Sequence, residues 1–466
     1  MKSYYSYGSI PATSSETSSD EENIRQSNEN WNDDTSEYES SRSRDSKKAS
    51  IPDQVANMTN SIIGGGVLSL PGGIALFANT SLFVDSSRAA LWTLGLGAVF
   101  AYFCWLIGRV CVQTKTMSYR DAWIRSMGDR GSIWISIANT FDPLLGLLAN
   151  ASIVSQSLQL LLEGILNIYW TETQCLLIVT VVAFLPLCLL KSLKALAPFS
   201  AFSMVAVVVA LVAMLIRFGD GSYQPNGTYY TDLAASKRPQ TEYTSDSTTT
   251  SWTSVLPFVC MVFTSFDMHY NSPRFYADLK DTSIPRYGVT VAYSFGLASL
   301  LYMAIAVVGF LTFGLTCDSF ILNNYSPRDP LATLSRLAMS LSSLLTYPLN
   351  FIGVRDNLLD TLRLKEFANA TSFRRNTFTI SLLALITLIS CFITDLGVIS
   401  AVGGGTTVTL VCFIFPACMF LSNALFKKDL SLDQVTEAVF VAILMGLSVF
   451  IGVVGTWDSV NQQQPN

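Results

Sequence analysis

The sequence predicts an all-α integral membrane protein with eleven transmembrane helices. Half of the 466 residues are apolar and only 14% are charged, against about 25% in an ordinary soluble domain. Ten segments beyond residue 51 each run for at least 18 residues without a charge, and another is interrupted only by Asp142. A helix of that length crosses the hydrocarbon core of a bilayer. Eleven such helices cannot all be buried inside a soluble chain of this size.

The predicted spans follow one another closely and are separated by polar loops. They cover residues 54–84, 89–108, 131–162, 173–190, 195–216, 247–266, 287–317, 337–354, 376–394, 396–426 and 438–457. We therefore expect a membrane domain over 51–457 and a short tail at 458–466. No cysteine or histidine cluster with metal-ligand spacing is present. Acidic net charge argues against a nucleic-acid partner.

Residues 1–50 form an acidic, serine-rich tail with ten acidic and six basic residues. Their composition predicts disorder, and they lack the apolar region of a signal peptide. Acidic residues beside Ser18 and Ser19 suit an acid-directed kinase. A plain solvated spacer is the alternative.

The basic residues predict a cytoplasmic N-terminus. In that orientation 17 of the 23 basic residues of positions 51–466 lie on the cytoplasmic side, as the positive-inside rule requires. Three Asn-x-Ser/Thr patterns, at Asn79, Asn226 and Asn324, lie in outer segments, and Asn226 and Asn324 are the candidate glycosylation sites. Cys175 and Cys317 lie near outer span ends and form either a disulfide or two free thiols.

The first span contains three consecutive glycines, Gly64, Gly65 and Gly66. They weaken a helix by roughly 3 kcal/mol in propensity. One interpretation is an unwound point, with a helix resuming at about Val67 whose free N–H groups and positive dipole bind a carboxylate. The other is a close contact between two helices.

The sixth span ends abruptly in polar residues and a proline at 264–273, and 253–280 is too long for one simple crossing. The first and sixth spans are thus interrupted at matching places in two sets of five. That pattern indicates an inverted-repeat transporter with its binding site between the two broken helices. The substrate carboxylate is expected on the amides of residues 65–67, and its amine near the carbonyls of Thr264 and Ser265.

The eighth span carries several hydroxyl groups before Pro348. Ser343 and Thr346 lie on one helical face. With carbonyls freed near Ile62 and Ile63, these oxygens are candidate ligands of a sodium ion. Hydroxyls in membrane helices also bond their own i−4 carbonyl, which is the alternative.

Four segments resemble the signature stretches of the amino acid/auxin permease family, closest to its neutral amino acid transporter branch. They are GGGVLSLP (64–71), FDMHYNSPRFYADLKD (266–281), TYPLNFIGVRD (346–356) and FIFPACMFL (413–421). The resemblance is collinear over about 51–457. It implies a leucine-transporter-like fold of two inverted five-helix repeats plus one helix, which moves amino acids by alternating access with a coupled cation.

The resemblance also assigns individual residues. Asn60 matches the first-helix asparagine that is tied to the sodium site in the sodium-coupled branch. His269 matches the family's Phe-x-Cys-His histidine, although Met268 stands where cysteine is usual. The polar position of the eighth helix falls on Ser343 or Thr346.

Asp142, Asp267 and His269 are ionisable groups placed inside predicted spans, where their cost makes a function the first hypothesis. Asp267 faces the substrate amine, accepts a proton or caps a half-helix. His269 is the only histidine and the first candidate for a pH response. Asp142 relays protons or pairs with Arg336.

The sequence therefore predicts a secondary active transporter of neutral amino acids, coupled to Na⁺ or H⁺. The expected partners are the substrate and the bilayer, the protein acts as a monomer, and no cofactor or enzymatic activity is expected. It resides in the plasma membrane or in a vacuolar or lysosomal membrane. A membrane sensor using the same pocket without flux is the alternative; an ion channel or a membrane enzyme would need a filter or a catalytic motif.

Overall fold

A computed structural model describes residues 48–190, 202–242, 251–362, 364, 371–425 and 431–461. The predicted tail lies outside the described residues except for its last three positions. From Ile51 onward the chain forms one compact unit. The described residues fold into helices and contain no β-strand, which confirms the predicted all-α class.

Nine of the described helices are long and apolar enough to cross a membrane, and a tenth crossing is a bent pair of helices. The first segment of the pair is α2 (Ile51–Ile62). The second consists of the 3₁₀ turn η1 (Gly65–Ser69) and the helix α3 (Leu70–Phe77) that continues it. The spans of the first half that follow are α4 (Leu82–Thr114), α6 (Ser132–Leu161) with η3 (Leu162–Leu166), α7 (Glu172–Val179) with η4 (Thr180–Phe184) and α8 (Leu185–Leu189), and α9 (Phe202–Gly219). The short α5 (Tyr119–Met127) links α4 to α6.

The second half begins with an interrupted element that is too short on either side of its break to count as a span. It comprises α10 (Val255–Ser265), η9 (His269–Asn271) and α11 (Ser272–Ala277). When this element is counted as one crossing, the described residues contain eleven crossings, which is the predicted number. The remaining spans are α12 (Ile284–Phe313), α13 (Pro330–Thr361), α15 (Ser372–Phe392), α16 (Leu396–Gly403) with the π-helix η11 (Gly404–Ile414) and α17 (Phe415–Leu425), and α18 (Leu432–Asn461). The last helix, α18, continues to Asn461, three residues into the segment predicted as the tail.

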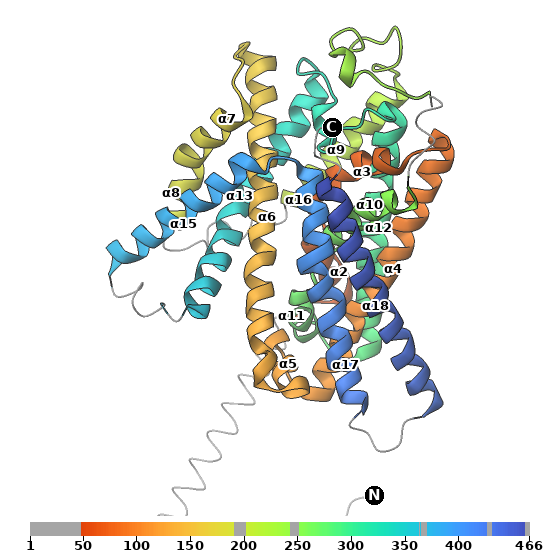
Figure 1. Cartoon of the computed structure of the whole chain (residues 1–466), viewed down its shortest axis with the longest axis vertical. Helices are drawn as coiled ribbons and strands as arrows, with labels where there is room; N and C mark the ends of the chain where they lie inside the picture. Colours follow the sequence, from red (N-terminus) through yellow and green to blue (C-terminus); the bar gives the residue numbers. More distant parts are fainter. Residues whose placement is uncertain are drawn as a thin grey trace, which may run out of the picture. The chain divides into compact units, whose positions relative to one another are not determined.

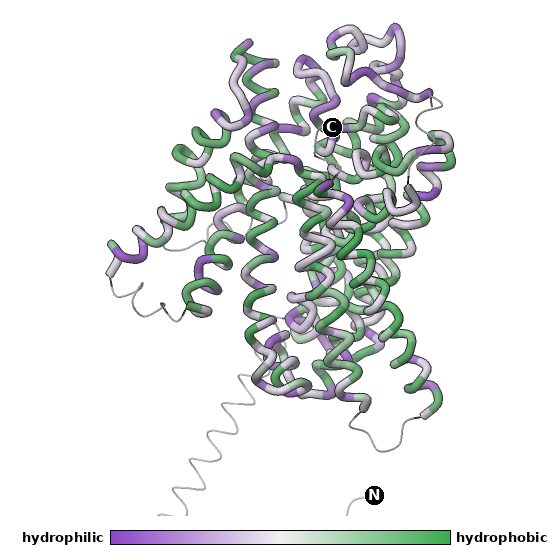
Figure 2. Tube along the Cα trace, in the orientation of Figure 1, coloured by the Kyte–Doolittle hydropathy of each residue, from purple (hydrophilic) through white to green (hydrophobic). Residues whose placement is uncertain are grey.

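Helix ends follow local chemistry. The Ser81 hydroxyl accepts a hydrogen bond from the Val84 amide and caps α4, and Thr171 forms a reciprocal capping box with Gln174 at the start of α7. Asp395 caps α16 through the Val398 amide at 2.9 Å. Apolar residues cover the helices, and hydrophilic residues gather in the loops and at helix ends (Figure 2).

The buried apolar residues form two separate cores. The larger first core joins α2, α3, α4, α9, α10, α12 and α17, and it also takes residues from α6, α13, α16 and α18. The second core joins α7, α8, α13 and α15 to one face of α6. Figure 1 displays the second group on one side of α6, and α4, α12 and α18 on the other. The two cores share the helices α6, α13 and α16.

Candidate functional site

The first span is broken where the glycines predict it. Residues 63 and 64 are not helical, and Gly64 is extended with φ −133° and ψ 172°. The segments on either side of the break differ in direction by 51°. A 3₁₀ turn fills residues 65–69, so the α-helix resumes at Leu70, three residues later than the predicted Val67.

The sixth span is broken as well. The helix α10 ends at Ser265, residues 267 and 268 are not helical, and a 3₁₀ turn precedes α11. The Thr264 hydroxyl donates to the carbonyl of Ser400 on α16 at 2.5 Å. Both predicted interruptions are therefore present, and both line one cavity.

Tyr302 on α12 connects the two breaks. Its fully buried hydroxyl lies 2.8 Å from the carbonyl oxygen of Ile62 and 2.8 Å from that of Ser265. The hydroxyl has one proton, so it donates a hydrogen bond to either of the two freed carbonyls at a time. In the sequence Tyr302 is only a tyrosine in the middle of a span, and that signal is too weak to identify a residue that bonds to both breaks.

A cavity of about 740 Å³ lies between the two breaks. Its wall includes residues from α2, α6, α10, α11, α13, α16 and η11, and therefore from both cores. Its mouth is marked by Arg274 and Asp278, which are 79% and 57% exposed. Gln54 and Asn57, near the start of α2, line the same end. We call this the mouth end.

The predicted carboxylate site lies partly in this wall. Gly64, Gly65 and Gly66 line the cavity, whereas Val67 is fully buried and does not line it. A side-chain carbon added at Gly65 would meet Ile153 Cδ1 at 2.6 Å, but one added at Gly64 would meet nothing within 4 Å. The cavity therefore has open space next to Gly64, where a side chain would fit.

Ser400 is a cavity residue that the sequence did not reveal. Its side chain is 1% exposed, it lines the cavity, and its hydroxyl has no hydrogen-bond partner. A buried hydroxyl without a partner is costly, so this one is available to a bound molecule. It lies near Gly66, whose added side-chain carbon would be 3.8 Å from Ser400 Oγ.

The predicted sodium ligands also line the cavity. Asn60, Ile63, Ser343 and Thr346 all contribute to its wall, and the Asn60 side-chain oxygen has no partner. The Thr346 hydroxyl donates to the Ser342 carbonyl at 2.9 Å, which is the i−4 bond expected as the alternative. Asn60 and Ser343 thus present the free side-chain oxygens of this group.

The two predicted membrane acids meet at the cavity wall. Asp142 on α6 and Asp267 in the break after α10 both line the cavity, and each lies within reach of the other's charge. The Thr407 hydroxyl donates to Asp142 Oδ1 at 2.9 Å, and the Cys412 thiol donates to Asp267 Oδ1 at 3.5 Å. Both donors come from η11, whose π-helical turns bring them to the same place.

Two other predictions about ionisable groups need correction. Asp142 does not pair with Arg336, because the fully buried guanidinium donates to the carbonyls of Leu322, Tyr325 and Ser326. His269 is also fully buried and does not line the cavity. Its Nε2 lies 2.9 Å from the carbonyl oxygen of Phe100.

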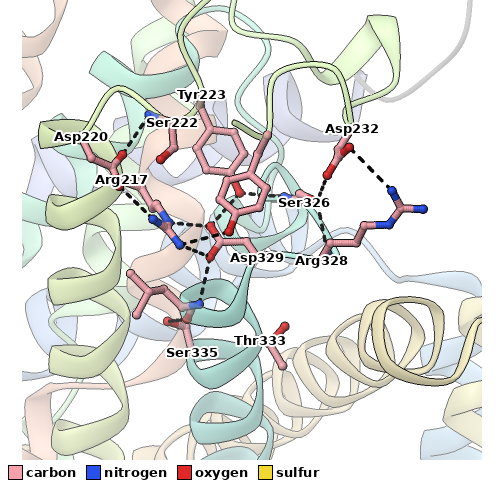
Figure 3. A network of polar contacts seen from close by, with 12 residues as sticks. Arg217, Asp220, Ser222, Tyr223, Asp232, Ser326, Arg328, Asp329, Thr333 and Ser335 are labelled. Atoms are coloured by element: carbon pink, nitrogen blue, oxygen red, sulfur yellow. Dashed lines mark hydrogen bonds and ion pairs between the residues drawn. The ribbon is translucent and has the colours of Figure 1, made fainter. Parts of the chain in front are cut away.

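A buried polar network joins the C-terminal end of α9 to the start of α13 (Figure 3). Asp329, whose side chain is 0% exposed, accepts from Arg217 Nε at 2.9 Å and Nη2 at 2.7 Å, and from the Tyr223 hydroxyl at 2.9 Å. Burial and the Asp329 charge raise the pKa of Tyr223, so its hydroxyl remains a donor. Beside them, burial alone would raise the pKa of the Asp220 carboxyl. Hydrogen bonds from Ser222 and Arg217 outweigh burial, so the pKa of Asp220 is lowered.

The predictions about glycosylation and the disulfide have different outcomes. Asn226 is exposed and remains a candidate for glycosylation. Asn324 is fully buried, accepts from the Asp318 amide and donates to the Thr316 carbonyl, so the prediction of a glycan there is wrong. The predicted disulfide is also wrong: Cys175 and Cys317 are free, because Cys175 is buried in α7 and the Cys317 thiol donates to the Gly309 carbonyl.

No group of three or more potential metal-binding His, Cys, Asp or Glu side chains occurs among the described residues. The cavity wall combines freed backbone groups, hydroxyls and amides with the carboxyl groups of Asp142, Asp267 and Asp278 and the guanidinium of Arg274.

Residues 47–458 match the family model described as transmembrane amino acid transporter protein. A putative sodium-coupled neutral amino acid transporter 11 of Danio rerio is 22% identical over 414 residues, covering 87% of this chain and 85% of the relative. A sodium-coupled neutral amino acid transporter 7 of Mus musculus is 28% identical over 188 residues, covering 38% of this chain and 40% of the relative.

Two solved structures share the fold. The inward-facing conformation of Mhp1 has a TM-score of 0.56 at 12% identity, and the match covers 90% of each chain. MhsT in complex with L-phenylalanine has a TM-score of 0.51 at 12% identity, over 86% of this chain and 98% of that one. The predicted leucine-transporter-like fold is thereby confirmed.

Proposed function

The chain belongs to the transmembrane amino acid transporter protein family, and on this premise we propose that it carries neutral amino acids together with a cation by alternating access. The observation that carries the proposal is the cavity between two interrupted helices. Freed backbone groups at membrane depth are tolerated only where protein, water or a ligand satisfies them. Here they face a space large enough for an amino acid.

The substrate carboxylate would rest on the amides at Gly65 and Gly66, at the start of the resuming helix. The positive end of the helix dipole favours an anion there. The Ser400 hydroxyl, buried and without a partner, supplies a further hydrogen bond. The amine would lie toward Thr264 and Asp267, which line the same cavity.

Sodium is the coupled cation that the relatives' names favour, since two of them are called sodium-coupled. The oxygens of Asn60, Ile63 and Ser343 would hold it beside the first break. Carbonyl, amide and hydroxyl oxygens are suitable ligands for such a hard cation. The partnerless Asn60 oxygen supports this assignment.

Alternation would come from movement of the two cores against each other, with the cavity between them. The exposed side chains of Arg274 and Asp278 mark the mouth of this cavity. We propose that the mouth faces the cytoplasm, as the basic residues predict, in a monomer of the plasma membrane or of a vacuolar or lysosomal membrane. Similarity to a structure described as inward facing supports this orientation.

Reconstituted protein tests the proposal. Proteoliposomes loaded with unlabelled alanine, glutamine and leucine should take up the labelled mixture by exchange, and an inward sodium gradient should drive net accumulation. Empty liposomes are the control. Binding that stabilises the protein without any exchange would contradict transport and would instead favour a sensor.

A further inference from the structure

A second hollow, which we call the side groove, lies between α4 and α18. Its volume is about 570 Å³, and its lining runs along α4 from Arg88 to Val99 and along α18 from Leu444 to Ile451. On both helices the lining residues recur every three or four positions, so each helix contributes one continuous stripe. Apart from Arg88, Trp92 and Ser448, the lining has only glycine and purely apolar side chains.

The floor of the side groove reaches the first core. It is formed by Phe263 and Phe413, whose buried rings lie 5.0 Å apart between centroids. Phe263 precedes the end of α10 at Ser265 by two residues, and Phe413 belongs to η11. A molecule in the groove would therefore pack directly against the helix that stops at the second break.

The side groove has the length of one leaflet of a bilayer. The 33 residues of α4 make a helix of about 50 Å, so a centred helix extends about 10 Å beyond each face of a hydrocarbon core of about 30 Å. Arg88 lies about 9 Å from the start of α4 and Val99 about 26 Å from it. The groove thus runs from the headgroup boundary to the middle of the bilayer.

A hollow at this depth has to be filled by something apolar. Water would find almost no polar partner along the lining, and a dry void would lose dispersion contacts on every side. Leu91 and Leu447 are exposed at its rim, so the groove is open toward the bilayer. An acyl chain can enter from there and runs over the same distance, from the headgroup boundary to the midplane.

Arg88 gives the outer end of the groove a group that binds phosphate. Its described hydrogen bonds both start from Nη1, which donates to Asn79 Oδ1 at 3.2 Å and to Asp85 Oδ1 at 3.1 Å. Asp85 also accepts from the amides of Asn79 and Thr80. Among the described residues no hydrogen bond uses Nε or Nη2 of Arg88, and the side chain is 44% exposed. A guanidinium with two free donors matches a phosphate group.

We propose that the side groove binds a membrane phospholipid, with one acyl chain between α4 and α18 and the phosphate group on the Arg88 guanidinium. The bound chain packs on Phe263 and Phe413 and stabilises the folded protein. The side groove shares no lining residue with the cavity between the broken helices. The inference therefore goes beyond the proposed transport function and does not depend on it.

The test follows thermal unfolding of the purified protein in dodecyl maltoside micelles as lipid is added. Dioleoylphosphatidylglycerol should raise the unfolding temperature until the effect saturates, because a ligand that binds only the folded state stabilises it. Dioleoylglycerol has the same chains without the phosphate. It should need about a tenfold higher mole fraction for half of the effect, which is the value of one hydrogen bond to a charged group. Cholesterol should give no saturable effect.

Gly95→Leu is the variant that blocks the groove. A side-chain carbon added at Gly95 meets nothing within 4 Å, so leucine fills the groove without displacing the protein. It should raise the half-saturating mole fraction of dioleoylphosphatidylglycerol at least about tenfold, the loss expected when about two methylene groups are no longer buried. Gly296→Leu on α12 is the matched control, because Gly296 also faces open space but lies outside the groove. It should keep the wild-type value.

Arg88→Gln tests the phosphate contact. In this variant the two dioleoyl lipids should have the same half-saturating mole fraction, and a tenfold preference for the phospholipid that persists overturns the role of Arg88. If the variant fails to fold, the comparison of the two lipids on the wild type still decides, since equal values there reject the phosphate site. Unchanged binding by Gly95→Leu rejects the groove as the site. Saturable stabilisation by cholesterol but not by the phospholipid overturns the proposal in favour of a sterol.

Discussion

Replacing Tyr302 by phenylalanine removes one oxygen atom from the point where the two broken helices meet. The ring keeps its place in the first core, so the change tests the hydroxyl alone. Without it, the carbonyl oxygens of Ile62 and Ser265 lose a donor that lies 2.8 Å from each. Leaving a buried acceptor without its partner costs about 1–3 kcal/mol, which is about 5- to 150-fold in the unfolding equilibrium.

The measurement is equilibrium unfolding of the purified protein in mixed detergent micelles, together with substrate exchange after reconstitution. Tyr302→Phe should lower the free energy of unfolding by the stated amount and slow exchange, since both breaks lose their shared anchor. Tyr293→Phe is the control, because Tyr293 lies on the same helix and is 64% exposed. Its effect should stay within about 0.5 kcal/mol. Equal stability of the two variants would refute the role assigned to the Tyr302 hydroxyl.

Three further substitutions and one change of glycosylation test other parts of the structure. Gly64→Leu should abolish exchange with little loss of stability, because its side chain enters open cavity space; exchange at the wild-type rate would contradict the substrate site. Arg217→Gln should cost about 3 kcal/mol of unfolding free energy by stranding the buried Asp329, whereas Arg328→Gln, 75% exposed, should cost under about 0.5 kcal/mol. Asn60→Ala should raise the sodium concentration for half-maximal exchange about tenfold or more; an unchanged sodium dependence argues against the ligand. Asn226→Gln should increase gel mobility by loss of a glycan, and identical migration would exclude one there.

The helices and both interruptions were predictable because their causes are local. Uncharged runs set the spans, three glycines weaken α2, and a polar stretch ending in proline stops α10. The cavity positions of Gly64 and Thr264 followed from these breaks and from their spacing by five helices. Even the 3₁₀ turn at 65–69 shifted the resumption of the α-helix by only three residues.

The remaining features depend on which side chains meet across long stretches of sequence. Asp142 could have faced Arg336 or a proton path, and only the packing of α6 against the break after α10 brings it to the same cavity wall as Asp267. Ser400 looked like any serine of an apolar span. Asn324 carried an acceptor pattern for a glycan, but a pattern of three residues carries no information on burial.

The nine sulfhydryl groups of this protein have a practical consequence. Six are buried, three are partly covered and none is exposed, so a membrane-impermeant maleimide should find little to modify in the unaltered chain. The natural sequence can therefore serve as its own background for labelling. A single reactive thiol introduced at Asn57, which is exposed at the mouth, would report which compartment supplies the water that reaches it.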